Sequence, residues 1–223
     1  MKVWAVVLAV VLVGAAGVSA GNYGAGFWVG HRTFSIITGT SSFTPGIMEL
    51  GGQFTWQVKE HLALRGSFAY NTGNYTQKEI RTFVTPPQVF TDEAKHSYSG
   101  FPIEFNVLPT FKVGDKLIVR AGGGFAYHSY SDKFTYTSTS GSGVVTTLTY
   151  PAASTSGFGT QFLLATEGKI NDNLGVEVVY KKDAGSFNYS LPRYTVNSNE
   201  SREEKATFGG GSDTYRLGLT FAF

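Results

Sequence analysis

The chain has 223 residues, with 18 lysines and arginines, 16 aspartates and glutamates, and no cysteine. A formal net charge of +2 is too small to recruit nucleic acid or an acidic surface, so we expect no nucleic-acid partner. The lack of cysteine excludes disulfides, a lipid anchor on cysteine and thiolate metal sites. We expect no metal and no cofactor.

The first twenty residues have the pattern of a cleaved export signal. Lys2 supplies a positive start, residues 3–16 are apolar, and Val18-Ser-Ala20 ends the segment in small residues. The apolar run is shorter than the roughly 18 to 20 residues that a membrane-spanning helix needs. The pattern therefore predicts a signal peptide at residues 1–20, cleavage after Ala20, and a single mature domain at residues 21–223.

Alternation of apolar and polar residues predicts eight β-strands in the mature chain. In chain order they cover residues 24–34, 46–58, 62–72, 98–113, 116–129, 157–170, 174–181 and 213–223. Short connections at residues 59–61, 114–115 and 171–173 alternate strictly with long ones. This order is typical of an all-β, antiparallel up-and-down transmembrane barrel with short periplasmic turns and long extracellular loops. An even strand count then places both termini in the periplasm.

The two faces of these strands differ in chemistry. One face is aromatic and aliphatic, as at Phe54 and Trp56, whereas the other carries nearly every strand charge; only Asp213, at the outer rim, falls on the apolar face. A charge that faces lipid at midplane costs about 2 to 4 kcal/mol, which explains the segregation. A soluble lipocalin-like barrel is the alternative, and Gly26-Phe-Trp28 resembles its first motif. No second motif follows, and a water-facing exterior should be denser in charge.

Charged residues on the polar face form the main candidate site. They are Glu49, Arg65, Glu104, Arg120, Glu167, Glu177 and Arg216. Eight strands enclose an interior just wide enough for side chains to fill, and buried charges must pair. We expect these charges to plug the lumen as ion pairs. Arg65, Arg120, Arg216, Glu167 and Glu177 should pair at similar depth, and Glu49 and Glu104 should lie farther from the short turns. A gated path for water and small ions would use the same residues.

Catalytic chemistry has weak support in the sequence. His61 and His96 are expected in solvent and His31 at the membrane interface. His128, followed by Ser129, Ser131 and Asp132, is the most crowded site, but no complete triad can be assembled. We expect no enzyme. The glycine run Gly122-Gly-Gly124 lacks the helix of a phosphate loop and fits close strand packing instead.

Three of the long connections resemble β-ribbons that prolong the strands. They cover residues 80–91, 134–150 and 194–208. Loops on a rigid scaffold commonly carry function, and ribbon edges can bind a partner strand, so these ribbons are candidates for an extracellular ligand. The alternative is that they are stiff spacers through the lipopolysaccharide layer.

The closing strand carries a family resemblance. Its apolar residues alternate and end on an aromatic: Tyr215, Leu217, Leu219, Phe221 and Phe223. With Gly51-Gly-Gln-Phe-Thr-Trp56, Phe101-Pro-Ile-Glu-Phe105 and Ala121-Gly-Gly-Gly-Phe-Ala-Tyr127, the chain resembles the eight-stranded outer-membrane barrels related to outer-membrane protein X and the membrane domain of outer-membrane protein A.

The resemblance implies the outer membrane of a Gram-negative bacterium, contact with its lipid and lipopolysaccharide, and a terminal strand that the barrel-assembly machinery reads as an insertion signal. It implies nothing about activity. The sequence predicts an integral outer-membrane protein with a structural or surface-interaction role. A narrow porin-like solute or ion channel is the second hypothesis, and an outer-membrane lipid hydrolase is the third.

Overall fold

The computed structural model describes residues 22–38, 41–44, 46–84, 87–149, 152–184, 187–194 and 201–223. The predicted export signal and its cleavage site lie outside these ranges. Within them, no helix has the length and apolarity to cross a membrane.

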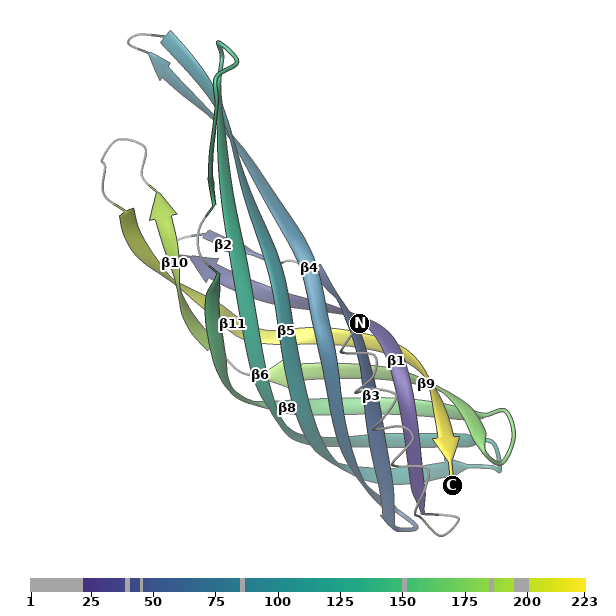
Figure 1. Cartoon of the computed structure of the whole chain (residues 1–223). Helices are drawn as coiled ribbons and strands as arrows, with labels where there is room; N and C mark the ends of the chain where they lie inside the picture. Colours follow the sequence, from purple (N-terminus) through teal and green to yellow (C-terminus); the bar gives the residue numbers. More distant parts are fainter. Residues whose placement is uncertain are drawn as a thin grey trace.

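Eight antiparallel strands form the wall of a closed barrel. In spatial order they are β1 (Tyr23–Thr38), β3 (Gly46–Lys59), β4 (Leu62–Val84), β5 (Pro87–Val113), β6 (Leu117–Ser140), β8 (Ala153–Lys169), β9 (Leu174–Ala184) and β11 (Ser201–Ala222). Pairing of β11 with β1 closes the ring (Figure 1). Three further strands lie in the long connections: β2 (Ser41–Phe43), β7 (Val145–Thr149) and β10 (Phe187–Tyr194). The predicted eight-stranded up-and-down barrel is confirmed.

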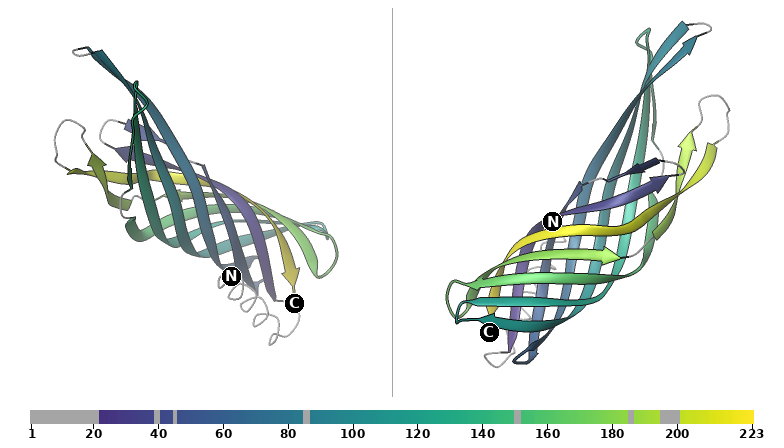
Figure 2. Two further views of the ribbon diagram at one scale, coloured as in Figure 1. Left: turned by 45° about the horizontal axis from the view of Figure 1, so that its top comes forward. Right: turned by 180° about the vertical axis from the view of Figure 1, so that it is seen from behind.

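The barrel has two unlike ends. The short connections at residues 60–61, 114–116 and 170–173 gather at one end, which we call the turn end. Both described termini lie there, because the Phe223 amide donates to the Tyr23 carbonyl at 2.9 Å. The long connections leave from the opposite end, which we call the ribbon end (Figure 2). Which end faces the periplasm stays a prediction.

Several strands run far past their predicted limits. β4 continues to Val84 instead of ending at residue 72, β5 begins at Pro87 instead of residue 98, and β6 reaches Ser140 instead of residue 129. These extensions and β7 form one antiparallel sheet, the blade, made of residues 73–84, 87–99, 131–140 and 145–149 (Figure 1). The ribbons predicted at residues 80–91 and 134–150 are confirmed. The third, predicted at residues 194–208, is a ribbon of β10 with the start of β11, so its first strand begins earlier, at Phe187; residues 195–200 lie outside the described ranges.

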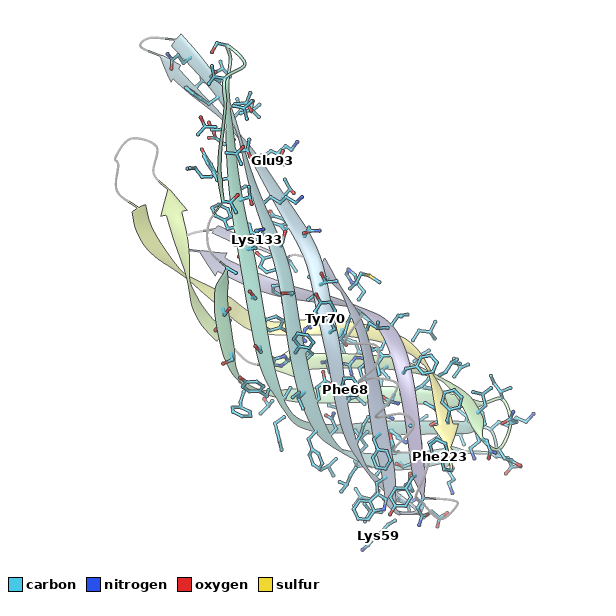
Figure 3. All side chains as sticks on the ribbon, viewed as in Figure 1. Lys59, Phe68, Tyr70, Glu93, Lys133 and Phe223 are labelled. Atoms are coloured by element: carbon cyan, nitrogen blue, oxygen red, sulfur yellow. The ribbon has the colours of Figure 1, made fainter. Side chains whose placement is uncertain are left out.

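The outward face of the barrel is apolar, as predicted, and ends in an aromatic girdle toward the ribbon end. The girdle consists of three cross-strand pairs, with ring centres 5.0 to 5.4 Å apart: Tyr70–Phe101, Tyr127–Phe158 and Tyr180–Tyr215. The next outward residues on the same strands are polar: Thr72, Ser99, Ser129, Ser156, Lys182 and Asp213. Such girdles mark the bilayer interface in membrane barrels. Figure 3 labels Tyr70 on the barrel and Glu93 and Lys133 on the blade.

Close packing explains the glycine run in β6. A Cβ atom added at Gly124 would lie 1.8 Å from the Phe105 carbonyl oxygen, and one at Gly122 would lie 2.1 Å from the Val107 oxygen. Only glycine lets β5 and β6 approach this closely, so the expected packing role is confirmed.

Candidate functional site

Among the described residues, as many buried cations as carboxylates line the lumen. The cations are Arg32, Arg65, Arg120, Lys181 and Arg216, and the carboxylates are Glu49, Glu104, Glu167, Glu177 and Asp183. Each is at most 9% exposed. All seven residues singled out from the sequence belong to this set. The alternation of the strands therefore brings them to one interior, where they separate into two clusters.

The turn-end cluster contains Arg65, Arg120, Glu167 and Glu177. Arg65 binds Glu177 through two parallel hydrogen bonds, Nη2 to Oε1 at 2.6 Å and Nη1 to Oε2 at 3.2 Å. Arg120 Nη1 donates to Glu167 Oε2 at 2.6 Å and lies 3.4 Å from Glu177 Oε1. Gln53 also donates to Glu177, at 2.8 Å. Two-point contacts of this kind fix orientation as well as charge.

The ribbon-end cluster is built around Arg216. Its Nε donates to Glu49 Oε1 at 2.5 Å, and its Nη2 and Nη1 donate to the two oxygens of Glu104 at 2.6 and 3.0 Å. Lys181 donates to the same Glu104 carboxylate. Arg216 thus pairs with the two carboxylates expected further up the lumen. The expectation that it pairs at the depth of Arg65 is wrong, because β11 places it opposite Val179 on β9, two residues toward the ribbon end from Glu177.

Two further members, Arg32 and Asp183, complete the ribbon-end cluster. Arg32 donates to Asp183, and Lys181 lies 3.4 Å from the same carboxylate. Sequence reasoning placed Asp183 in a loop, because the alternation of β9 was traced only to residue 181. Asp183 lies two residues after Lys181 and therefore has the same inward parity. Extending the alternation of β9 by one more inward position would have identified it as a lumen residue.

Two of the ion pairs span the full width of the barrel. β4 and β9, which carry Arg65 and Glu177, are four strands apart in either direction around the ring, and so are β5 and β11, which carry Glu104 and Arg216. A pair that joins opposite walls leaves its section of the lumen occupied by side chains. Beside these pairs, Ala63, Leu108, Leu163, Ala165 and Val179 form a small apolar cluster.

An aromatic cap lies next to the ribbon-end cluster, where the blade begins. The rings of Phe34, Tyr98 and Tyr130 are buried, with centres 5.6 Å apart for Phe34–Tyr98 and 6.1 Å for Phe34–Tyr130. His128 stacks on Tyr130 at 5.8 Å. Sequence reasoning missed this cap, although Tyr130 shares the inward parity of His128.

The histidines lie in three kinds of surroundings. The His61 side chain is 77% exposed, as expected. His31 is exposed, and its place at the membrane interface stays a prediction. The prediction that His96 is solvated is wrong, because its Nδ1 lies 2.8 Å from Asp132 Oδ2 and both side chains are buried. The cause is the extension of β5, which carries His96 inside the sheet. On β6, Ser129 and Ser131 alternate with His128 and therefore face the other side of the strand.

The residues predicted as the insertion signal line the outward face of β11. Tyr215 and Leu217 are 59% and 56% exposed, and Leu219, Phe221 and Phe223 are partly exposed. Tyr215 is paired with His31 of β1 and Tyr180 of β9. Their role as a signal stays a prediction.

Comparison with known proteins reveals fold similarity without sequence similarity. No family model and no curated protein matches the sequence. The outer membrane protein OprG from Pseudomonas aeruginosa is 10% identical, with a TM-score of 0.55 over 93% of this chain and 98% of that chain. The N-terminal β-barrel domain of OprF from Pseudomonas aeruginosa is 10% identical, with a TM-score of 0.49 over 92% and 100% of the two chains. Neisserial surface protein A is 9% identical, with a TM-score of 0.46 over 92% and 100%.

Identity this low shows the fold and leaves activity open. Three findings indicate the same architecture: the closed ring of eight antiparallel strands, its apolar exterior and its similarity to OprG. The chain has the fold of the eight-stranded outer-membrane β-barrels, the architecture that its sequence resembles.

Proposed function

We propose that this chain is an integral outer-membrane protein with a closed lumen, which holds the blade outside the cell as a surface for partners. In this proposal the turn end lies in the periplasm and the girdle at the outer interface. The apolar exterior and the girdle support contact with outer-membrane lipid and lipopolysaccharide.

The lumen favours closure over transport. Five cations balance five carboxylates, and two of their contacts join opposite walls. Breaking one partner from a buried pair typically costs about 3 to 5 kcal/mol, so these contacts resist spontaneous opening. The aromatic cap adds a second barrier above them.

The main support for a surface role is that β4, β5 and β6 continue without a break from the barrel into the blade. About 9 to 11 residues of a tilted strand cross a bilayer, whereas β5 has 27 residues. More than half of β5 is therefore available outside the membrane, and it keeps its pairing with both neighbours from Phe90 to Gly100. A sheet that grows out of the barrel wall is held rigidly, which suits a binding surface better than a flexible loop does.

The blade offers two features that a protein partner can use. Its tip exposes Ile80, Val89 and Val145, at 70%, 47% and 59%. Among the described residues, β4 beyond residue 72 pairs only with β5, and β7 pairs only with β6, so each presents a free edge. Free edges bind added strands through main-chain hydrogen bonds.

The test removes the blade and keeps the barrel. A variant in which residues 74–97 and 131–154 are each replaced by a tight turn should fold, because the barrel ladder stays intact and loop length changes stability only slowly. It should lose binding to host cells and matrix proteins, while a variant shortened only in β10 retains it. If the bladeless barrel folds and binds like the parent, the surface role of the blade is wrong.

A narrow path for water or small ions is the second candidate. Asn71, which is fully buried in the lumen, has no hydrogen-bond partner for either amide atom among the described residues, and neither does Thr214 Oγ1. Buried polar atoms of this kind are usually satisfied by water. Single-channel recording on refolded protein in planar bilayers decides between the two candidates, since a closed lumen gives no conductance above the bare bilayer.

A further inference from the structure

A cavity of about 180 Å³ lies in the lumen at the turn end, below the turn-end cluster. Its charged lining residues are Arg65, Lys112, Arg120, Glu167 and Lys169. Four of these are cations and one is a carboxylate. The five cations and five carboxylates of the two clusters balance, whereas the charges that line this cavity do not.

Lys112 and Lys169 create this imbalance. Both occupy inward positions near the turn end, where their strand partners are Ile118 and Gly175, neither of which can neutralise them. The carboxylate nearest to Lys112 belongs to Glu60, at 4.0 Å, and both side chains are more than half exposed. An exposed pair at that distance contributes little. The arginines above already share Glu167 and Glu177, so the two lysines add an excess charge of +2 at the mouth.

Arg120 supplies the second observation, because it is the one lumen arginine whose Nε has no partner among the described residues. The Nε atoms of the other three donate to Ser212 from Arg32 at 2.9 Å, to Thr55 from Arg65 at 3.2 Å, and to Glu49 from Arg216 at 2.5 Å. The hydrogen bonds that Arg120 makes to other described residues all come from Nη1. A buried cationic donor without a hydrogen-bond partner destabilises the folded state. A ligand that accepts a hydrogen bond from this donor removes that free-energy penalty when it binds.

We propose that this turn-end cavity binds a small oxyanion of the phosphate type, held by Arg120, Lys112 and Lys169. Guanidinium and ammonium groups bind phosphate oxygens through charge-assisted hydrogen bonds. Arg120 Nε has almost no accessible surface in the present conformation. Contact with the anion therefore requires a small rotation of the guanidinium group that keeps the hydrogen bond from Nη1 to Glu167 and turns the Nε–H group toward the cavity. The site does not depend on the blade or on any partner of it.

The arginine Nε–H groups give a direct test in the mature chain, labelled with ¹⁵N-arginine and refolded in a non-ionic detergent at low salt. Titration with inorganic phosphate should shift the Arg120 signal in a saturable way, while the Arg216 signal, already bonded to Glu49, stays in place. The variant R120K identifies the signal. No saturable shift of Arg120, or an equal shift of Arg216, overturns the proposal and leaves the cavity to water.

Paired lysine variants separate a site from general charge attraction. Lys112→Gln combined with Lys169→Gln should weaken phosphate binding by about tenfold or more, because two cations leave the site. The matched control is Lys59→Gln with Lys116→Gln, which removes the same charge from exposed positions beside the turns and outside the cavity. Equal weakening by the control overturns the proposal.

The oxyanion can come from solution or from a phospholipid headgroup at the nearby bilayer surface. Vesicles of a phosphate-free glycolipid in phosphate-free buffer, with and without added phosphatidylglycerol, distinguish these sources. A shift of the Arg120 signal with phosphatidylglycerol assigns the headgroup, and a shift with inorganic phosphate alone assigns the free ion. If neither probe moves the signal, the site is not an oxyanion site.

Discussion

The guanidinium carbon of Arg216 lies 4.4 Å from the centre of the Trp28 ring, and the indole Nε1 of Trp28 lies 3.3 Å from Glu49 Oε1, which Arg216 also binds. The aromatic face holds the guanidinium while its three nitrogens contact two carboxylates. Arg216 is therefore the centre of the ribbon-end cluster, and Trp28 reports on it.

Removal of Arg216 should be among the most damaging lumen changes. Arg216→Gln leaves Glu49 without its short contact, and leaves Glu104 with the hydrogen bonds from Lys181 and Ser67. We expect a loss of about 3 to 5 kcal/mol in the free energy of unfolding. The measurement is denaturant unfolding followed by tryptophan fluorescence, with the exposed Lys133→Gln as control. Unchanged stability together with unchanged conductance would show that the cluster does not hold the lumen closed.

Removal of both partners of the Arg65–Glu177 pair should cost less than removal of either one. Arg65→Met leaves a buried carboxylate and Glu177→Met leaves a buried guanidinium, whereas the double variant leaves neither. Each single change should cost about 3 to 5 kcal/mol, and the double variant should be more stable than both. The same unfolding assay completes the double-mutant cycle. Additive single effects would mean that the two side chains do not interact.

The His96–Asp132 contact should anchor the root of the blade. Asp132→Asn weakens a buried hydrogen bond to a charged group, a contact typically worth about 1.5 to 3 kcal/mol. We expect faster amide hydrogen exchange, by roughly tenfold or more, in the blade around these residues and no change in the barrel strands. Asp115→Asn in the turn at the other end is the control. Uniform protection in the variant and the parent would remove the anchoring role.

Gly124→Ala should block correct pairing of β5 and β6. The added methyl group would lie 1.8 Å from the Phe105 carbonyl oxygen, a distance that backbone cannot accommodate without displacement. Gly66→Ala is the matched control, because a Cβ there meets nothing within 4 Å. The yield of heat-modifiable folded barrel on cold gel electrophoresis measures the effect. Equal yields for both variants would contradict the packing argument.

The sequence predicts the fold well because strand parity is a local property. Phe54 and Arg65 reveal their faces through their immediate neighbours, and the cost of a charge in lipid enforces the pattern. Partner choice in the lumen is not local. It depends on the stagger of the strands around the ring, which decides that Arg216 meets Glu49 and Glu104 and not Glu177.

The ends of the strands were harder to predict for a second physical reason. Apolar alternation marks where a strand crosses lipid, but hydrogen-bonded pairing continues wherever the backbone allows it. His96 and Asp183 lie just past the last apolar outward residues, so they were assigned to loops, and their burial in the sheet was missed.

The uninterrupted course of β5 also has a mechanical consequence. A force that pulls on the blade along its strands is carried by the ladders from β5 to β4 and β6, which lie parallel to the load. Such ladders yield only when many hydrogen bonds shear together, whereas a hinged loop would unzip one bond at a time. The blade is therefore coupled rigidly to the barrel. A force that a bound partner applies at its tip is transmitted through these ladders to the barrel wall.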